Sequence, residues 1–595
     1  MIKDFAPARH NWAMPLCTLF FLCTLFWSGH GGDLGYWSDW MASLSQGYEH
    51  IHANYPPLLL HWFWLLAQLF DLLHLEYPPA SPVQLKFFVL LPVLATQLWL
   101  CRQVELLLAK RGIEPLRSPI FWGVVASPAL LLDGPVWGQV DLLPFLPMWV
   151  SLVCAFRARF FSAGAAFALA LVWKFQAIVI LPVLAGLFMH RWRLATWHYA
   201  PQALAGFLLV GFVAFLPFIW VGRFQEMFNA AYLGNTSIFP LSTMNAANLW
   251  FLLAGNNTDM LLPLIEGAAW ASPHKLGLGL FLLVSVMCMV RAWRGCRGFG
   301  EVIGIAMVMI LGFFTVAPSM HERYLFLMVP LAALGCARGY FRSAWLHLAN
   351  LMVALNILLV LPLTGHMVWQ HLSWLVVGVA LAALLVFVLP GARIAAMARR
   401  LLYRARQSLP ALAMPHGGAL AALMVLAFTC TELYQLHRLN HPAWDERGRL
   451  YLSDYRELSV TQQWGHLSRD RAVNDDPLDI FGHRFAKGLG VHAFSQVEFR
   501  IPEGARYFHS FYGLNRSGEN GRVRFRILLD GKSAWQSGAI GWQAPGEVVL
   551  PVSDAETLTL QVHGMGSIIS DHANWAEAGF WQGIPERRVL TMARR

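Results

Sequence analysis

The sequence predicts a polytopic α-helical membrane protein with an all-β domain at its C-terminal end. The 595 residues are 57% hydrophobic and only 13% charged, which is about half the charged fraction of a typical soluble protein. Apolar runs of roughly 20 residues, each long enough to cross a bilayer, recur between residues 13 and 435. After residue 436, segments of alternating apolar and polar residues replace them.

Thirteen apolar segments are expected to span the membrane. They cover residues 13–29, 85–107, 118–132, 142–156, 160–173, 175–189, 200–221, 276–292, 302–317, 325–337, 344–363, 372–390 and 418–435. Lys3 and Arg9 precede the first run, but no convincing small-residue cleavage site follows it, so we expect a retained span and not a signal peptide. Residues 1–435 are thus assigned to the membrane domain and residues 436–449 to a linker.

The basic connectors give the orientation of the chain. With the N-terminus in the cytoplasm, the Arg-rich connectors, including ARIAAMARRLLYRARQ, face inward as the positive-inside rule requires. Counting the apolar residues 58–73 as a span would invert every later connector. Two prolines open this stretch and polar residues interrupt it, so we expect a helix lying in the outer interface.

The C-terminal region, residues 450–595, predicts an antiparallel β-sandwich. Alternating segments at 496–501, 522–529, 547–552 and 557–564 are separated by turn sequences such as RSGENG and LDGK. None of the eight cysteines lies in this region, so no disulfide framework is expected. An odd number of spans places the sandwich on the outer face.

Acids and aromatic residues gather in the connectors of that same outer face. These connectors read GGDLGYWSDW (31–40), NYPPL (54–58), DGPVWGQVD (133–141), NAANLW (245–250) and MHERYLF (320–326). Ionisable groups collected at one rim predict an active site there, whereas a solute path would place them inside the spans. The net charge of +10 comes mostly from residues beside the spans, so no nucleic-acid partner is expected.

The outer motifs resemble those of the GT-C glycosyltransferases that use lipid-phosphate sugars. The shared pattern is Gly32-Asp33, then Trp40-Met41, then Tyr55-Pro56-Pro57-Leu58, and LLLDGPVWGQVD and MHERYLF agree with it. The likeness covers roughly residues 13–390 and is nearest to lumenal glucosyltransferases and mannosyltransferase-like bacterial and archaeal relatives. It implies a GT-C fold and inverting transfer of mannose or glucose from a polyprenyl-phosphate donor to an extracytoplasmic glycan or glycolipid. It implies no metal and no cofactor.

The resemblance places Asp33 at the family's catalytic position, where a carboxylate would accept the proton of the attacking hydroxyl. The alternative role for Asp33 is a helix N-cap, which is common for Asp after glycines. Asp39 follows six residues later. Residues that are six apart on a helix do not lie on the same face. We therefore expect Asp39 to contact sugar or acceptor, if it acts directly, and not to pair with Asp33.

Three cationic or protonatable residues are candidates for the donor phosphate. Arg323 and His321 lie where the tenth span opens, and an Arg fork suits a phosphate. Their alternative role is an interfacial anchor in which Glu322 pairs with Arg323. Lys174, between two short spans, would reach the same headgroup or else snorkel to the surface.

Four further residues are candidates for contact with the sugar or the acceptor. Trp137, Gln139 and Asp141 share one outer turn, where Trp stacks on pyranose faces and carboxylates hold hydroxyls. Their alternative is an interfacial Trp with capping acids. Tyr55 is the fourth, and its alternative is a rigid turn with the two prolines that follow it.

The C-terminal region has a second, independent resemblance. AKGLGVHAFSQVEF (486–499), FRILLDGK (525–532) and SDHANWAEAGF (570–580) resemble the NPCBM carbohydrate-binding modules, which have a galactose-binding-like sandwich. Asp571, His572, Asn574 and Trp575 match a signature of that family, with either a structural or a sugar-contacting role. The bacterial character of this fusion, and the lack of a eukaryote-type retention signal, predict a bacterial inner membrane.

The sequence leaves two other function classes open. The first is a transporter of lipid-linked sugar or glycan, which would need polar groups along a path through the membrane. The second is a carbohydrate-binding protein in which the membrane part is only an anchor. Thirteen spans with concentrated outer motifs exceed what an anchor needs.

Overall fold

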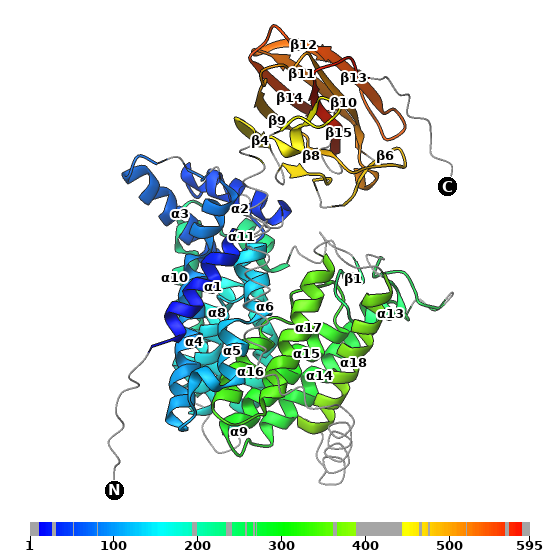
Figure 1. Cartoon of the computed structure of the whole chain (residues 1–595). Helices are drawn as coiled ribbons and strands as arrows, with labels where there is room; N and C mark the ends of the chain where they lie inside the picture. The colour runs from blue at the N-terminus through cyan, green and yellow to red at the C-terminus, as the bar shows by residue number, and fades with distance from the viewer. Residues whose placement is uncertain are drawn as a thin grey trace. The chain divides into compact units, whose positions relative to one another are not determined.

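The computed structural model describes residues 11–26, 31–51, 53–75, 77–79, 81–192, 199–233, 241–255, 259–265, 268, 270–360, 366–387, 439, 443–462, 467–473, 476–518, 521–565 and 571–585. The chain divides into two compact units (Figure 1). The first consists of Met1–Leu25, Trp40–Tyr77 and Phe87–Leu426, and the second of Phe26–Asp39, Pro78–Lys86 and Ala427–Arg595.

Apolar helices form at twelve of the thirteen segments that the sequence predicts to span the membrane. They are α1 (Ala13–Leu25), α4 (Pro82–Lys110), α5 (Pro119–Val125) with α6 (Pro128–Leu131), α7 (Phe145–Phe156), α8 (Phe160–Trp173), η3 (Phe175–Ile180) with α9 (Leu181–Trp192), α10 (Tyr199–Trp220), α14 (Pro273–Trp293), α15 (Phe299–Val316), α16 (Met328–Ala337), α17 (Ser343–Val360) and α18 (His366–Phe387). The segment 418–435 and the basic connector 391–415 lie outside the described residues.

Five of the described helical segments are long and apolar enough to cross a membrane. These are Val83–Lys110, Pro119–Trp137, Pro201–Trp220, Pro273–Trp293 and Phe299–Val316. The other apolar helices have 10–17 residues. A helical membrane region is thus present, and the count of thirteen spans stays a prediction.

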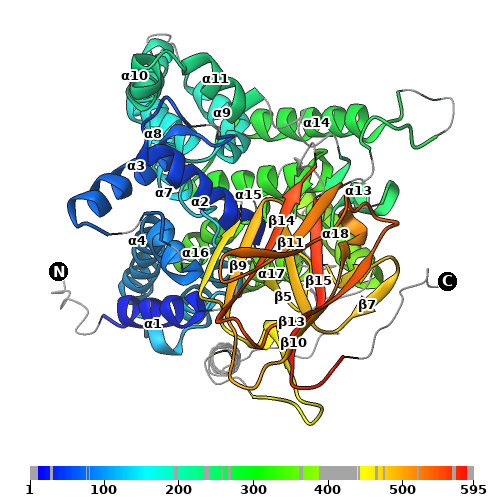
Figure 2. The ribbon, with the colours of Figure 1, turned by 90° about the horizontal axis from the view of Figure 1, so that it is seen from above.

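Small residues let neighbouring helices approach closely. α8 and α10 pack side by side (Figures 1 and 2), and each has a glycine at the contact. A Cβ atom at Gly164 would overlap the carbonyl of Ala203, and one at Gly206 would overlap the carbonyl of Phe161. Such backbone contact supplies the van der Waals packing that holds helices together where water drives no association.

The stretch predicted to lie in the interface is the helix α3 (Pro57–Leu72), and Pro57 is its first residue. One face of α3 is buried through residues such as Phe63 and Phe70. Leu65, Leu69 and Leu72 are exposed. On the packed side, the His61 Nε2–H donates to the Ala214 carbonyl at 2.7 Å, and the Tyr48 hydroxyl donates to His61 Nδ1 at 2.8 Å.

A short parallel pair, β1 (Thr243–Met244) with β2 (Met320–His321), fixes the start of the MHERYLF segment. The neighbouring NAANLW segment anchors β1 to the helices. Asn248 caps α13 (Leu249–Leu253), and its Nδ2 donates to the Phe314 carbonyl at 3.2 Å. Trp250 Nε1 donates to the Val316 carbonyl at 2.8 Å. The segment therefore closes the open carbonyl end of α15.

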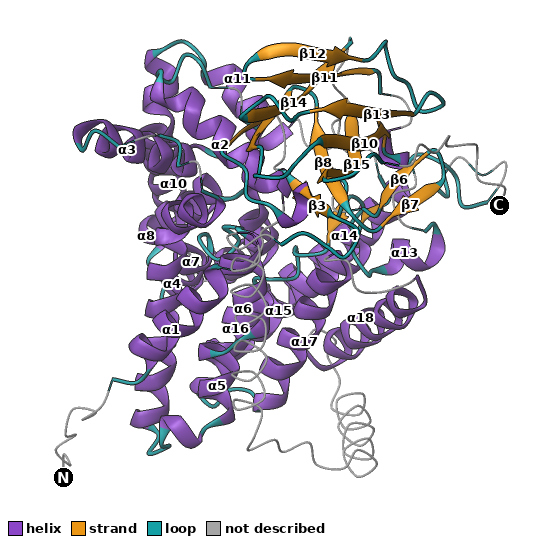
Figure 3. Ribbon diagram, turned by 45° about the horizontal axis from the view of Figure 1, so that its top comes forward, coloured by secondary structure: helices purple, strands orange, loops and turns teal. Residues whose placement is uncertain are grey.

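The second unit contains a β-sandwich of two antiparallel sheets, shown as two layers in Figure 3. One sheet has the order β13-β10-β15-β8-β5, with β3 on β15, and the other has the order β12-β11-β14-β9-β4. The strands of the unit, with the separate hairpin β6–β7, are β3 (Arg449–Tyr451), β4 (Ser459–Gln462), β5 (Ser468–Arg469), β6 (Leu478–Ile480), β7 (His483–Phe485), β8 (Gly488–His492), β9 (Ser495–Arg500), β10 (Tyr507–Leu514), β11 (Val523–Leu529), β12 (Lys532–Gln536), β13 (Gly546–Pro551), β14 (Thr557–Gly564) and β15 (His572–Trp581).

The sandwich confirms the all-β prediction, and the four predicted strands are β9, β11, β13 and β14. Three long or central strands, β8, β10 and β15, were not predicted. Most of their residues are buried and none is exposed, so apolar and polar residues do not alternate along them. Trp444, which lies within the expected linker, packs against the sandwich core.

We expect residues 443–595 to fold when expressed alone. The core of this region is built from its own strands, with Phe499, Phe525 and Phe580 completely buried, and burial of this kind is the main stabilising term in a small domain. A circular dichroism spectrum rich in β-structure and a cooperative thermal transition would show it. A helical or unfolded spectrum would contradict this prediction.

Candidate active site

A tight turn after α6 presents Asp141 to other connectors that the sequence predicts to face outward. Residues Leu132–Trp137 form a π-helix that ends at Gly138, whose φ of 95° lies in the left-handed region that favours glycine. The Gly138 amide donates to the Gly134 carbonyl at 2.7 Å and the Gln139 amide to the Asp133 carbonyl at 2.9 Å. The chain thereby reverses, and Trp137, Gln139 and Asp141 are all buried.

Asp141 is the centre of an ion-pair cluster built from three separate connectors. Its side chain is completely buried, and Lys174 Nζ pairs with Oδ1 while Arg323 Nε lies 3.6 Å from Oδ2. Lys174 follows the last turn of α8 in extended conformation, which turns it away from the helix axis. Its side chain is therefore held by Asp141 and does not reach to the surface. A buried carboxylate needs such partners, because an unpaired charge away from water is costly.

Glu322 is the second carboxylate of this cluster. Arg323 Nη1 donates to Glu322 Oε1 at 2.6 Å, and His321 Nδ1 lies 3.8 Å from Oε2. Burial alone would raise the pKa of Glu322, but the Arg323 guanidinium and His321 outweigh it and hold the pKa at about 2. Glu322 therefore stays ionised at neutral pH and is not suited to accept a proton. The predicted Glu322–Arg323 pair is present.

Aromatic rings border both cations. The Arg323 guanidinium lies 5.7 Å from the centroid of the Trp137 ring, and Lys174 Nζ lies 5.5 Å from that of Tyr55. Trp40 in turn lies 5.5 Å from Tyr55. Cations over aromatic faces gain electrostatic stabilisation, most where water is excluded. Tyr55 thus contacts Lys174 and also begins the turn into α3.

Two buried amides beside the cluster have an oxygen that no described residue hydrogen-bonds. Gln139 Oε1 is one, and the side chain is 1% exposed. Gln176 Oε1 is the other, while its Nε2 donates to the Tyr324 carbonyl at 3.1 Å. A buried acceptor without a donor is unfavourable, and a sugar hydroxyl would supply one. Gln176 was not among the predicted residues, although it lies two residues after Lys174 in WKFQ.

The acids of the predicted first outer loop lie on α2 (Gly31–Ser45). Asp33 is half-buried and lies inside the first turn of the helix, not at the residue that precedes it. A carboxylate there is stabilised by the helix dipole. Asp39 is exposed, and the spacing of six residues turns it away from the face of Asp33.

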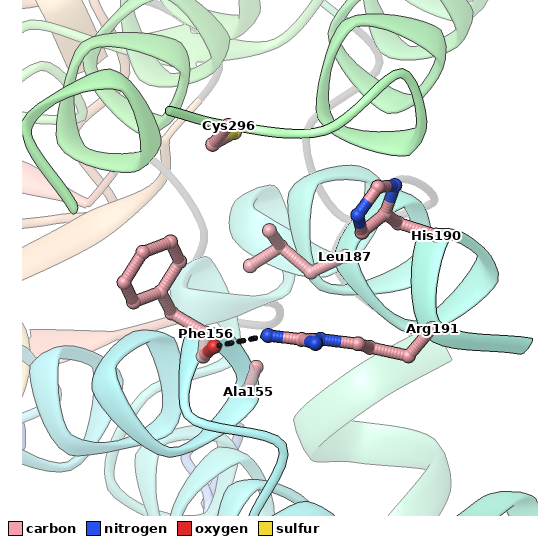
Figure 4. Close-up of a pocket in the computed structure, with 6 residues that line it drawn as sticks. All are labelled: Ala155, Phe156, Leu187, His190, Arg191 and Cys296. Carbon is pink, nitrogen blue, oxygen red and sulfur yellow. Dashed lines mark hydrogen bonds between the residues drawn. The ribbon is translucent and has the colours of Figure 1, made fainter. Parts of the chain in front are cut away.

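A pocket, drawn in Figure 4, lies between the C-terminal parts of α7 and α9, whereas Asp141 precedes α7. It is lined by Ala155, Phe156, Leu187, His190, Arg191 and Cys296 and has a volume of about 40 Å³. Arg191 Nη2 donates to the Phe156 carbonyl across it at 3.4 Å. Such a volume holds little more than ordered water, so we assign no ligand to it. The described residues contain no group of three or more His, Cys, Asp or Glu side chains arranged for a metal ion.

Three of the four signature residues of the sandwich are buried, and His572 is half-buried. Trp575 is 1% exposed, and its ring meets that of Phe525 edge-on at 4.9 Å. Asp571 and Asn574 are completely buried, and Asp571 accepts a bond from the Arg522 amide at 2.9 Å. The His572 ring lies 5.7 Å from that of His492. None of the three buried side chains is available at the surface to a glycan.

Comparison with known proteins identifies the C-terminal region. Residues 448–581 match the NPCBM/NEW2 domain. The alpha-1,3-galactosidase B of Akkermansia muciniphila is 26% identical over 126 residues, which are 20% of this chain and 16% of that protein. The chain therefore spans only a small part of the length of that relative.

Two solved structures are similar to this chain over very different extents. The CBM51 from Clostridium perfringens GH95, in complex with methyl-galactose, is 24% identical over 22% of this chain and 99% of its own, with a TM-score of 0.21. The arabinosyltransferase EmbB from Mycobacterium smegmatis is 11% identical over 98% of this chain and 66% of its own, with a TM-score of 0.38. The predicted NPCBM resemblance of the C-terminal region is confirmed, and this chain carries an NPCBM/NEW2 domain at residues 448–581.

Proposed function

We propose that this protein is an inverting glycosyltransferase of GT-C type that uses a polyprenyl-phosphate monosaccharide, mannose or glucose, as its donor. The observation that carries this proposal is the cluster in which Lys174 and Arg323, from distant connectors, share the buried Asp141. Two cations assembled with aromatic neighbours at one end of a helical membrane region suit a phosphate headgroup whose lipid stays in the bilayer.

The balance of charges in the cluster suits the binding of a phosphate. Asp141 and Glu322 offset the charges of Lys174 and Arg323, which keeps the buried cations stable while no donor is bound. A donor phosphate would add negative charge, and the Arg fork and Lys174 would turn toward it. As the leaving phosphate gains charge, these two cations would stabilise it more than they stabilise the bound donor, and this difference would accelerate the reaction.

In the proposed reaction, the general base comes from the predicted first outer loop. The acceptor oxygen attacks the anomeric carbon, the bond from that carbon to the phosphate oxygen breaks, and the electron pair leaves on the phosphate. The proton of the acceptor hydroxyl passes to the Asp33 carboxylate. Asp33 and Trp40 are seven residues apart in α2, close to two helical turns, so their side chains leave the same face. Trp137, Gln139, Asp141, Tyr55 and Asp39 would contact the sugar or the acceptor.

We assign the NPCBM domain to an extracytoplasmic glycan or glycolipid acceptor, and the protein to a bacterial inner membrane. A transporter of lipid-linked sugar would need ionisable groups along the spans. The cluster described here instead brings together the predicted outer connectors. A membrane-anchored carbohydrate-binding protein would have no use for buried cations in its helical part.

Reporter fusions test the proposed orientation. We expect fusions after residues 405 and 445 to report opposite sides of the membrane, with 405 in the cytoplasm, because residues 391–415 contain the most basic connector. Alkaline phosphatase and a cytoplasmic fluorescent protein at each site give complementary readings. The same side at both positions would remove the thirteenth span and the extracytoplasmic placement of the sandwich.

Donor turnover separates the three function classes. Purified protein would be incubated with polyprenyl-phosphate mannose or glucose and with a glycolipid extract of its own membranes as acceptor. A transferase releases polyprenyl phosphate from one of these donors. A transporter in liposomes moves the intact donor, and an anchor does neither. Donor that stays intact under all conditions would contradict the proposal.

A further inference from the structure

Gln176 holds a buried hydrogen-bond acceptor next to the Asp141 cluster, and no step of the proposed reaction uses it. The side chain is 7% exposed, and no described residue donates to its Oε1. We propose that Gln176 determines the choice of donor sugar by accepting a hydrogen bond from the hydroxyl at C2 of that sugar. The inference rests on the transferase function proposed above, and it names the feature of the donor that the site recognises.

The side-chain amide of Gln176 has a defined direction. Its Nε2 donates to the Tyr324 carbonyl at 3.1 Å. A carbonyl oxygen only accepts hydrogen bonds, so the amide nitrogen must face Tyr324 and the amide oxygen must face away from it. Gln176 therefore presents an acceptor on the side opposite Tyr324.

Gln176 lies where the two connectors that carry the cations meet. Lys174 precedes it by two residues at the start of η3, and Tyr324, which holds its amide, directly follows Arg323. Lys174 and Arg323 each contact one oxygen of Asp141. A donor phosphate bound by these two cations would thus bring the anomeric end of the sugar toward Gln176.

The chemistry of a glycosyl phosphate restricts what this acceptor can bind. The phosphodiester is ionised at neutral pH and has no proton to donate. Two other positions of the sugar adjoin the anomeric carbon, namely the ring oxygen, which only accepts, and C2, whose hydroxyl donates. The C2 hydroxyl is therefore the hydrogen-bond donor of the sugar that lies nearest to the phosphate.

A contact at C2 would distinguish the two candidate donors. Mannose and glucose differ only in the configuration at C2, where the hydroxyl is axial in mannose and equatorial in glucose. Because the Tyr324 carbonyl fixes the direction of Gln176 Oε1, this acceptor suits one of the two orientations better than the other. A site built to bond a hydroxyl also rejects an analogue that lacks it, since the polar group of the site is then left unpaired.

Donors that lack one hydroxyl test the contact. We would measure kcat/KM for polyprenyl-phosphate mannose and glucose, for their shared 2-deoxy form, and for the 4-deoxy form of the preferred donor. The wild-type protein is compared with Gln176→Met, because Met is similar in size and shape but has no amide oxygen. The intrinsic reactivity of each donor cancels in this comparison, since both proteins use the same donors.

The two deoxy donors should respond differently to the substitution. We expect the ratio of kcat/KM for the preferred donor to that for the 2-deoxy donor to fall at least about tenfold in Gln176→Met. The preference between mannose and glucose should fall with it. The corresponding ratio for the 4-deoxy donor should change less than about twofold.

Gln97 provides the matched control. Its side chain is completely buried in α4, and no described residue bonds either its nitrogen or its oxygen, so no described partner fixes the direction of its amide. Gln97→Met removes a buried amide outside the cluster and should leave all these ratios within about twofold. Thermal unfolding of both variants shows whether they fold. If Gln176→Met does not fold, Gln176→Asn, which draws the amide back by one methylene, replaces it with the same expected loss of preference.

Two results would overturn this inference alone. One is an unchanged 2-deoxy ratio in the folded Gln176 variant, and the other is an equal change for the 2-deoxy and 4-deoxy donors or for the Gln97 variant. Both presuppose that the wild-type protein turns over at least one donor. A wild-type protein that turns over neither mannose nor glucose donor would overturn the transferase itself, and the role of Gln176 with it.

Discussion

Asp33→Asn should lower the turnover of the polyprenyl-phosphate donor by roughly two to four orders of magnitude. The substitution keeps the size of the side chain and its capacity to accept hydrogen bonds, but it removes the proton acceptor. Donor affinity should change less than about threefold, because the phosphate and the lipid are assigned to other groups. Initial rates at saturating acceptor, together with a donor titration, measure both quantities.

The control for Asp33 is another carboxylate expected at the outer face. Asp71 is exposed near the end of α3, and Asp71→Asn should leave turnover within about twofold. If Asp33 acts only through the helix dipole, Asn keeps most of the local hydrogen bonding and activity should persist. A fully active Asp33→Asn protein would remove the proposed base and leave the fold intact.

Arg323→Ala should have a different kinetic signature from Asp33→Asn. Arg323 is assigned to the phosphate in the bound donor and in the transition state, so its loss should weaken donor affinity at least about tenfold and lower turnover by about two to three orders of magnitude. It would also leave Glu322 and Asp141 without a cation that they contact in the structure. Some loss of thermal stability is therefore expected.

Two further variants separate the chemistry of Arg323 from its part in stability. Arg323→Lys keeps the charge that Glu322 and Asp141 need but has no planar fork, so the fold should recover while turnover stays at least about tenfold low. Arg338, at the other end of α16, lies 5.6 Å from the ring of Trp149. Arg338→Ala loses a comparable ring contact and should retain turnover. Equal activity of the Arg323 and Arg338 variants would contradict the phosphate assignment.

Sequence motifs predicted several of the residues that lie in or beside the Asp141 cluster, but not Gln176. Each connector carries its own helix boundary and turn signal, and the positive-inside pattern predicts the side on which it lies. Trp137, Asp141, Lys174, His321 and Arg323 could therefore be expected near one another. Their pairing could not be predicted. Lys174 pairs with Asp141 where the backbone leaves α8 in extended conformation, and that conformation depends on tertiary packing.

The features that escaped prediction share one physical cause. β1 and β2 are two residues each, and β8, β10 and β15 are buried along most of their length. Neither kind of strand has the period-two alternation that marks a strand with one exposed face. Gln176 is a similar case, since an amide side chain has no sequence signal until its burial and its partners are known.

The most direct test of the central claim is ³¹P NMR of the donor during incubation with the wild-type protein and acceptor. Transfer converts the phosphodiester of polyprenyl-phosphate sugar to the phosphomonoester of polyprenyl phosphate, and the two groups have distinct signals. We predict that the monoester signal grows at the rate of glycoside formation and that it is absent with Asp33→Asn on the same time scale. A diester signal that persists with the wild-type protein, for both the mannose and the glucose donor, would contradict the proposed reaction.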